Sequence, residues 1–86
     1  MSAYRIEFAK SASRELRSLD APMVRRIVAK IDALATDPRP HGCKKLEGSE
    51  DVWRIRIGDY RVIYRIDDTK RLIDVSAVRH RRDAYR

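Results

Sequence analysis

The spacing of apolar residues changes along the chain, and each change marks a predicted element. Residues 3–8 alternate between apolar and polar side chains, which is the period of a half-buried strand. From Ala9 to Leu19 the apolar positions recur every three or four residues, which predicts a helix with a weak amino-terminal cap. A second helix is predicted from residue 21, because Asp20 can cap its first turn and Pro22 suits that turn.

The rest of the chain is predicted to be a loop followed by three strands. The second helix cannot continue through the Asp-Pro-Arg-Pro run at 37–40, and residues 41–51 are predicted to form a loop. Alternation then predicts strands at 52–57, 60–66 and 72–78. Two helices cannot close a core alone, so the sequence predicts one α+β domain over residues 1–86. In it a two-helix hairpin packs on one face of a small, mostly antiparallel twisted sheet, in the order β-α-α-β-β-β.

The turns between these strands predict which side chains lie opposite one another. Gly58-Asp59 suits a two-residue type II′ turn with a positive φ at Gly58, which pairs Arg56 with Arg61 on the face away from the helices. A four-residue turn at 67–70 then places Ser76 beside Arg61 and directs His80 toward the same corner. The same register assigns Ile73, Val75 and Ala77 to the core.

The composition indicates an acidic binding partner and argues against several classes of site. The 86 residues carry 20 Lys and Arg against 13 Asp and Glu, a net charge of +7. No apolar run could span a bilayer and the amino terminus lacks the apolar segment of a signal peptide, so we expect a cytoplasmic protein. Cys43 is the single cysteine, and with His41 and His80 it offers too few ligands for zinc, so we expect no metal and no cofactor.

The predicted register gathers arginines at one corner of the sheet. A planar guanidinium can bind phosphate through two parallel hydrogen bonds, and arginines that face each other across strands repel. A solvated face with arginine stems over apolar neighbours is the plainer interpretation of such residues. We favour a phosphate site because so many cations converge beside a histidine and a tyrosine. These cations are Arg54, Arg56, Arg61, Arg79 and Arg81.

Cleavage of RNA is the chemistry that such a corner could support. The 2′-hydroxyl of RNA is a built-in nucleophile, so the protein must supply a base, an acid and cations for the developing charge. Arginine serves only the last role. His80 and Tyr85 are the candidate proton carriers, although Tyr85 could equally stack on a base and His80 could be an ordinary surface residue.

The sequence resembles the RelE/ParE superfamily of toxins from bacterial toxin–antitoxin pairs, and its RelE-like branch most of all. The resemblance rests on YRIEF at 4–8, KKLEG at 44–48, WRIRIGDYRVIYRI at 53–66 and VRHRRDAY at 78–85. It implies two helices packed on a mostly antiparallel sheet and cleavage of mRNA in the ribosomal A site without metal, leaving a cyclic phosphate. It also implies a RelB-like antitoxin partner.

The resemblance assigns roles to individual positions of this chain. Arg54 and Arg56 stand where the best-known members have lysines, one of them proposed as the general base. Either His80 replaces that base or catalysis is weak. The remaining positions carried over as catalytic are Arg61, Arg81 and Tyr85, and those expected to bind RNA are Lys44, Lys45, Arg79 and Arg82.

Two other functions remain open from the sequence. A ParE-like protein would inhibit DNA gyrase without doing chemistry, which the missing lysines favour and the tail of His80, Arg81 and Tyr85 does not. The third alternative is an inactive homologue that only binds RNA.

Overall fold

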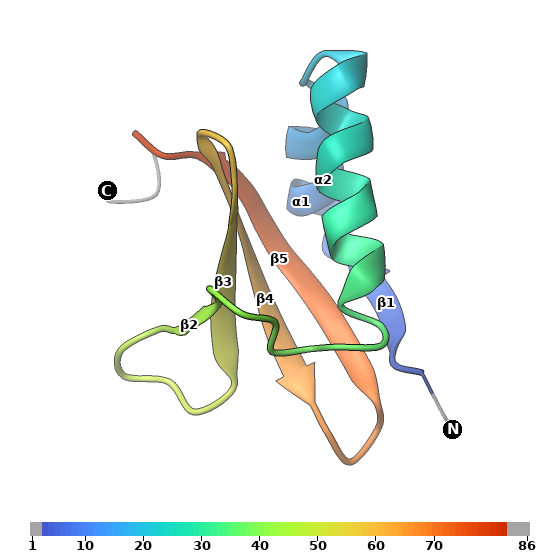
Figure 1. The fold of residues 1–86 in the computed structure, drawn as a ribbon, viewed down its shortest axis with the longest axis vertical. Coiled ribbons are helices and arrows are strands. Elements are labelled where there is room, and N and C mark those ends of the chain that lie inside the picture. The colour runs from blue at the N-terminus through green and yellow to red at the C-terminus, as the bar shows by residue number, and fades with distance from the viewer. Residues whose placement is uncertain (1–2, 83–86) are drawn as a thin grey trace.

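The computed structural model describes residues 3–82, and they form two layers, with both helices on one face of a five-stranded sheet (Figure 1). The sheet order is β1-β5-β4-β3-β2. β1 runs parallel to β5, and the other neighbours are antiparallel. The predicted fold class is therefore confirmed. The elements are β1 (Arg5–Phe8), α1 (Lys10–Arg17), α2 (Ala21–Ala33), β2 (Lys44–Lys45), β3 (Val52–Ile57), β4 (Tyr60–Asp67) and β5 (Leu72–His80).

The core lies between the helices and the sheet. Ala12 of α1 and Ile27 and Ile31 of α2 are fully buried against the sheet, as the helical spacing predicts. Tyr64 of β4 is also fully buried, and its hydroxyl donates a hydrogen bond to the Pro38 carbonyl at 2.8 Å. This bond satisfies a polar group that would otherwise be costly to bury. Burial raises the pKa of the Tyr64 phenol far above its ordinary value.

The helix caps differ from the prediction at one position. Asp20 occupies the N-cap of α2, but among the described residues its side chain makes no cap hydrogen bond. Pro22 lies in the first turn, as predicted. Packing of Ile27 and Ile31 against the sheet therefore holds α2 in place more than capping does.

The predicted pairing of β3 with β4 is confirmed in full. Gly58 has a φ of +59° and Ile57 pairs with Tyr60, so the hairpin turn is the two-residue one. Arg56 consequently lies directly opposite Arg61.

The predicted pairing of β4 with β5 is wrong. β4 continues to Asp67, which pairs with Leu72, so the turn occupies residues 68–71 and Arg71 takes a left-handed φ of +54°. A β-bulge then leaves Ser76 without an opposite residue, because Ile63 pairs with Ala77 and Tyr64 with Val75. A one-residue insertion exchanges the faces of every later side chain in the strand.

This bulge changes four predicted positions. Val78 joins the cluster packed between the helices and the sheet, whereas Ala77, although buried, lies opposite Ile63 on the other face. The later turn shifts the pairing by two residues and the bulge by one more, so Arg79, not Ser76, lies opposite Arg61. His80 pairs with Tyr60 and so belongs to the helix side of the sheet.

Lys44 and Lys45 form the short edge strand β2 instead of the predicted loop. Lys44 pairs with Arg54 and Lys45 with Trp53. Because opposite residues share a face, Lys44 joins Arg54 on the face away from the helices, whereas Lys45 does not. No described helix is long and apolar enough to cross a membrane.

Candidate phosphate-binding site

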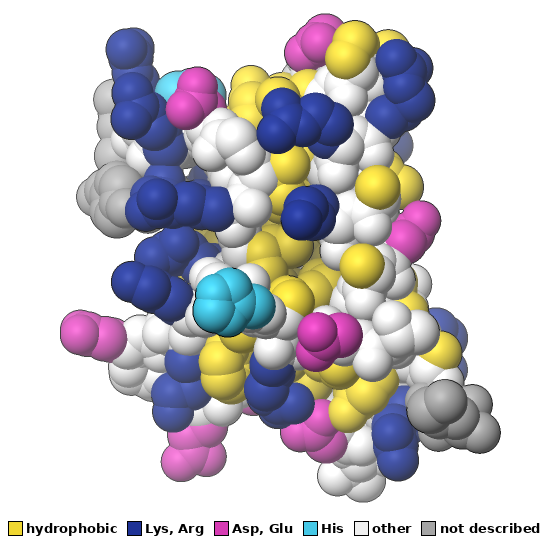
Figure 2. Space-filling model, in the orientation of Figure 1, with side chains coloured by type: hydrophobic (Ala, Val, Ile, Leu, Met, Phe, Trp, Pro, Cys, Tyr) yellow, Lys and Arg dark blue, Asp and Glu magenta, His cyan; other side chains and the backbone are white. Residues whose placement is uncertain are grey.

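The face of the sheet away from the helices, called here the open face, carries a row of three arginines. Arg56, Arg61 and Arg79 lie side by side on β3, β4 and β5. Lys and Arg side chains gather along the left side of the molecule in Figure 2, which is the side of this face. Nothing in strand packing requires like charges at three adjacent positions, and each opposed pair costs a few tenths to about 1 kcal/mol. The row therefore indicates a surface shaped for an anion.

Arg61, in the middle of this row, is only 5% exposed. Among residues 3–82 it is the one charged side chain that is buried. Its neighbours Arg56 and Arg79 are exposed. Burial fixes the position of a long side chain and so lowers the entropic cost of binding a ligand there.

The chain beyond β5 closes the end of this row. The Arg81 backbone N–H donates to the Asp59 carbonyl at 2.7 Å, which holds Arg81 beside the β3–β4 turn. The Arg81 Nε also lies 3.8 Å from Asp59 Oδ1. A hollow of about 320 Å³ results, called here the arginine notch. It is lined by Arg56, Gly58, Asp59, Arg61 and Arg81.

The arginine notch has the composition of a phosphate site. Its three arginines come from β3, β4 and the segment after β5. Each can bind phosphate oxygens through two parallel hydrogen bonds. The notch can therefore hold a phosphodiester and stabilise negative charge that develops on it.

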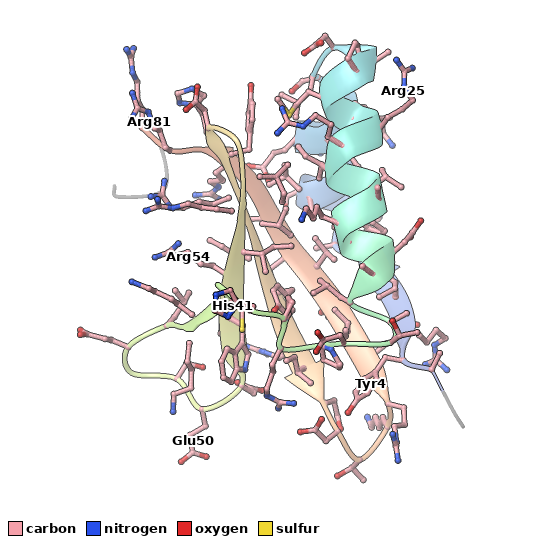
Figure 3. The ribbon with its side chains drawn as sticks, in the orientation of Figure 1. Tyr4, Arg25, His41, Glu50, Arg54 and Arg81 are labelled. Atoms are coloured by element: carbon pink, nitrogen blue, oxygen red, sulfur yellow. The ribbon has the colours of Figure 1, made fainter. Side chains whose placement is uncertain are left out.

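Lys44 and Arg54 extend the basic surface along the sheet. They are cross-strand neighbours on the open face, and Arg54 is two residues before Arg56 along β3. In Figure 3, Arg54 and Arg81 both extend from the side of the sheet that faces away from the helices. Lys44 and Arg54 thus widen the positive surface around the notch.

Arg79 is directed away from the notch, although it belongs to the same row. Its Nε donates to Glu15 Oε2 of α1 at 3.1 Å. Glu15 Oε1 accepts a second hydrogen bond from the Val78 backbone N–H at 3.0 Å. This N–H lies beyond the end of β1, whose last residue Phe8 pairs with Val75, so α1 supplies the partner that β1 no longer can. Arg79 is thus fixed at the rim of the basic surface.

His80 is not in the notch, so its predicted position is wrong. It lies on the helix side, in a hollow of about 520 Å³ between α1 and the ends of β4 and β5. Its ring packs against the Tyr60 ring in a T-shaped arrangement, with 5.3 Å between the centroids. Its Nδ1 accepts a hydrogen bond from the Arg82 backbone N–H at 3.2 Å. The bulge at Ser76 is the physical reason, because it exchanges the two faces of the strand end.

Three other predicted positions complete the placement. Arg82 is exposed next to the notch residue Arg81, and Lys45 is exposed beside Trp53. Tyr85 lies outside the described residues. Within residues 3–82, no group of three or more His, Cys, Asp or Glu side chains is placed to hold a metal ion.

Asp59 also lines the notch, whereas the sequence predicts it only as a turn residue. The signal that could have found it is its place between Gly58 and Tyr60, next to the opposed pair of Arg56 and Arg61. A two-residue turn necessarily carries its side chains to the end of that arginine row.

The fold recurs in known proteins. The family model described as ParE toxin of type II toxin–antitoxin system matches residues 6–85. The chain belongs to the RelE/ParE toxin superfamily. It is 30% identical to the toxin RelG of Mycobacterium tuberculosis over 84 residues, covering 96% of this chain and 97% of that protein.

Solved structures of RelE proteins share the whole architecture. The RelE–RelB complex of Pyrococcus horikoshii matches with a TM-score of 0.83 and 33% identity, covering 92% of this chain and 96% of that one. The RelBE toxin–antitoxin complex of Escherichia coli matches with a TM-score of 0.78 and 28% identity, covering 88% of this chain and 94% of that one. The two helices on a five-stranded sheet are therefore the fold of RelE toxins.

Proposed function

We propose that this toxin is an endoribonuclease that cleaves mRNA on the ribosome and so inhibits translation in the cytoplasm. The arginine notch carries this proposal. Arg56, Arg61 and Arg81 converge there from three segments, on a RelE fold. A notch that grips one phosphodiester suits a reaction in which the substrate brings its own nucleophile.

The proposed reaction needs little machinery from so small a domain. The 2′-hydroxyl attacks the adjacent phosphorus, the bond to the 5′ oxygen breaks, and a 2′,3′-cyclic phosphate remains. The arginines hold the phosphate in line for attack and stabilise the charge that develops on its oxygens. No step in this reaction calls for a metal or another cofactor. Lys44, Arg54 and Arg79 bind neighbouring phosphates of the strand in this proposal.

Position-specific cutting of mRNA tests the proposed function. Primer extension on mRNA from translating ribosomes should show new ends with wild-type protein and essentially none with Arg81→Ala. Arg81 is largely exposed and its backbone bond survives the change, so this variant should fold. Arg61→Ala should also be inactive, with circular dichroism as the check on its fold. Intact mRNA with the wild-type protein contradicts the proposal.

Arg25→Ala is the matched control for these variants. Arg25 extends from α2 on the side away from the sheet, far from Arg81 (Figure 3). The Arg25→Ala substitution removes one positive charge without changing the notch. Cutting by this variant should equal that of wild type, which separates a local site from the effect of net charge.

The proposed protein partner is a RelB-like antitoxin with an acidic amphipathic segment. The similar structures from Pyrococcus horikoshii and Escherichia coli are a RelE–RelB complex and a RelBE toxin–antitoxin complex, respectively. In this chain a groove of about 630 Å³ runs between α2 and β3, with the basic residues Arg26, Lys30 and Arg56 around it. Figure 2 shows apolar surface between these elements. A segment bound there would contact Arg56 and so restrict access to the notch.

Inhibition of DNA gyrase is the second candidate function. The matching family model is that of ParE toxins, which is the observation in its favour. It predicts the accumulation of cleaved DNA bound to gyrase and no cutting of mRNA. Normal plasmid supercoiling during growth arrest counts against it.

A further inference from the structure

We propose that Asp59 accepts the proton of the 2′-hydroxyl during RNA cleavage, after the substrate phosphate has displaced its carboxylate from Arg81. This inference rests on the endoribonuclease function proposed above. It assigns the proton acceptor that the arginines themselves cannot provide.

The residues that line the arginine notch lead to Asp59. They are three arginines, one glycine and Asp59. The guanidinium has no acceptor atom, whereas an ionised carboxylate is an acceptor through both oxygens. His80, the other candidate, lies with Tyr60 on the helix side of the sheet. Among the described lining residues, Asp59 is thus the one side chain able to take a proton beside the bound phosphate.

The present contacts of Asp59 leave its carboxylate available. It is 68% exposed and lies 3.8 Å from Arg81 Nε, longer than the ~2.7–2.9 Å of a good charge-assisted hydrogen bond. A bound phosphate offers Arg81 two oxygens at hydrogen-bonding distance and so displaces the Asp59 carboxylate from Arg81. The backbone bond from Arg81 N–H to the Asp59 carbonyl does not involve the carboxylate, so the turn stays in place when the ion pair opens.

The proposed step balances in protons and bonds. The 2′ O–H proton moves to an Asp59 Oδ as the 2′ oxygen forms its bond to phosphorus. The bond from phosphorus to the 5′ oxygen breaks, and that oxygen takes a proton from water. The hydroxide so formed takes the proton held by Asp59, which restores the carboxylate. The arginines carry the extra negative charge throughout and exchange no proton.

The test compares cleavage with binding in Asp59→Asn, an uncharged variant of nearly the same shape. The rate is measured as single-turnover cleavage of mRNA on programmed ribosomes. Binding without reaction is measured with mRNA that carries 2′-deoxy nucleotides around the cut site. Loss of a general base costs about 100-fold or more in rate. The Asp59→Asn variant should therefore cleave mRNA at least about 100-fold more slowly than wild type. It should bind the deoxy mRNA as tightly as wild type or more tightly, because a negative charge has been removed from the notch.

A control and a rescue separate chemistry from structure. Glu50→Gln removes one carboxylate in the loop between β2 and β3, at the opposite end of the sheet from Arg81, and should change neither quantity (Figure 3). Formate should restore part of the rate of Asp59→Ala, whereas chloride at the same ionic strength should not.

Three outcomes overturn the inference in distinguishable ways. Cutting by Asp59→Asn at the wild-type rate shows that another group takes the proton. Parallel loss of binding and cutting shows that Asp59 only positions Arg81. Absence of cutting by the wild-type protein itself overturns the endoribonuclease function, and the proton acceptor with it.

Discussion

Arg61 and Arg79 lie directly opposite each other on β4 and β5, because the bulge at Ser76 brings Arg79 to the position that Val78 would otherwise occupy. With Arg56 on the other side of Arg61, three like charges meet on adjacent strands. This arrangement costs stability in the free protein, by up to about 1 kcal/mol for each opposed pair. A bound anion removes that cost.

Phosphate should therefore stabilise the protein more than chloride does. We expect the thermal midpoint to rise with inorganic phosphate beyond the rise produced by sodium chloride of equal ionic strength, because phosphate binds only the folded notch. Differential scanning fluorimetry measures both.

The Arg81→Ala variant is the check on this expectation. It should lose most of the phosphate-specific increment, whereas Arg25→Ala should keep it. Equal increments in the two variants would show that phosphate binds elsewhere.

Glu15 holds the end of β5 and should contribute to stability. Glu15→Ala leaves the Val78 N–H without its partner and frees Arg79. An unsatisfied backbone group of this kind costs about 1–3 kcal/mol. Urea unfolding should show a loss in that range, and a smaller loss for Glu15→Gln, which keeps an acceptor oxygen. A loss below about 0.5 kcal/mol for alanine would show that water replaces the carboxylate.

The sequence predicts what local patterns determine. The helices follow from apolar spacing, and the β3–β4 register follows from Gly58, since a two-residue turn leaves no freedom in pairing. Arg56 and Arg61 could be paired from the sequence for this reason.

The bulge could not be predicted, because its cause is not local. Ser76 is an ordinary strand residue by its neighbours. β5 is a central strand between β1 and β4, and β1 ends at Phe8, where α1 takes over its edge. The Ser11 hydroxyl contacts the Ser76 carbonyl at 3.5 Å, a tertiary contact across 65 residues. Without the bulge, His80 is predicted on the open face, whereas the structure places it on the helix side; Arg79 lies beside Arg61 as expected.

Asp68 makes the stability of the other end of the sheet depend on pH. Arg39 and the Tyr4 hydroxyl both donate to its carboxylate, and these bonds hold the pKa of Asp68 below its ordinary value of 3.8. A depressed pKa in the folded state stabilises the fold above the unfolded pKa, and this contribution is lost as the pH falls through the folded value. Wild type should exceed Asp68→Asn in unfolding free energy at pH 7.

That difference should shrink as the pH falls below about 4, where the carboxylate is progressively protonated. Urea titrations of both proteins at pH 7, 4 and 3 measure it. The related variant Asp67→Asn serves as control, since the Asp67 carboxylate accepts a hydrogen bond from the Lys70 backbone N–H and, among the bonds of the described residues, none from an arginine or a tyrosine. A difference that stays constant with pH would show that packing rather than charge explains the effect of Asp68.

Gly58 connects the geometry of the turn to the arginine notch, and alanine there should damage both. At a φ of +59° a side chain strains the backbone by about 1–2 kcal/mol. The added Cβ would meet only the end of the flexible Arg26 side chain, at 3.6 Å, so the strain lies in the backbone and not in a clash. We expect relief of that strain to move Asp59, the other residue of the turn, and Arg56, two residues before Gly58. Gly48→Ala is the matched control, because Gly48 also has a positive φ of +79° and nothing within 4 Å of the added Cβ, but it belongs to the loop after β2. Both variants should lose similar unfolding free energy in urea, and only Gly58→Ala should lose phosphate stabilisation and mRNA cutting. Equal function in the two variants would show that the notch does not depend on the conformation of this turn.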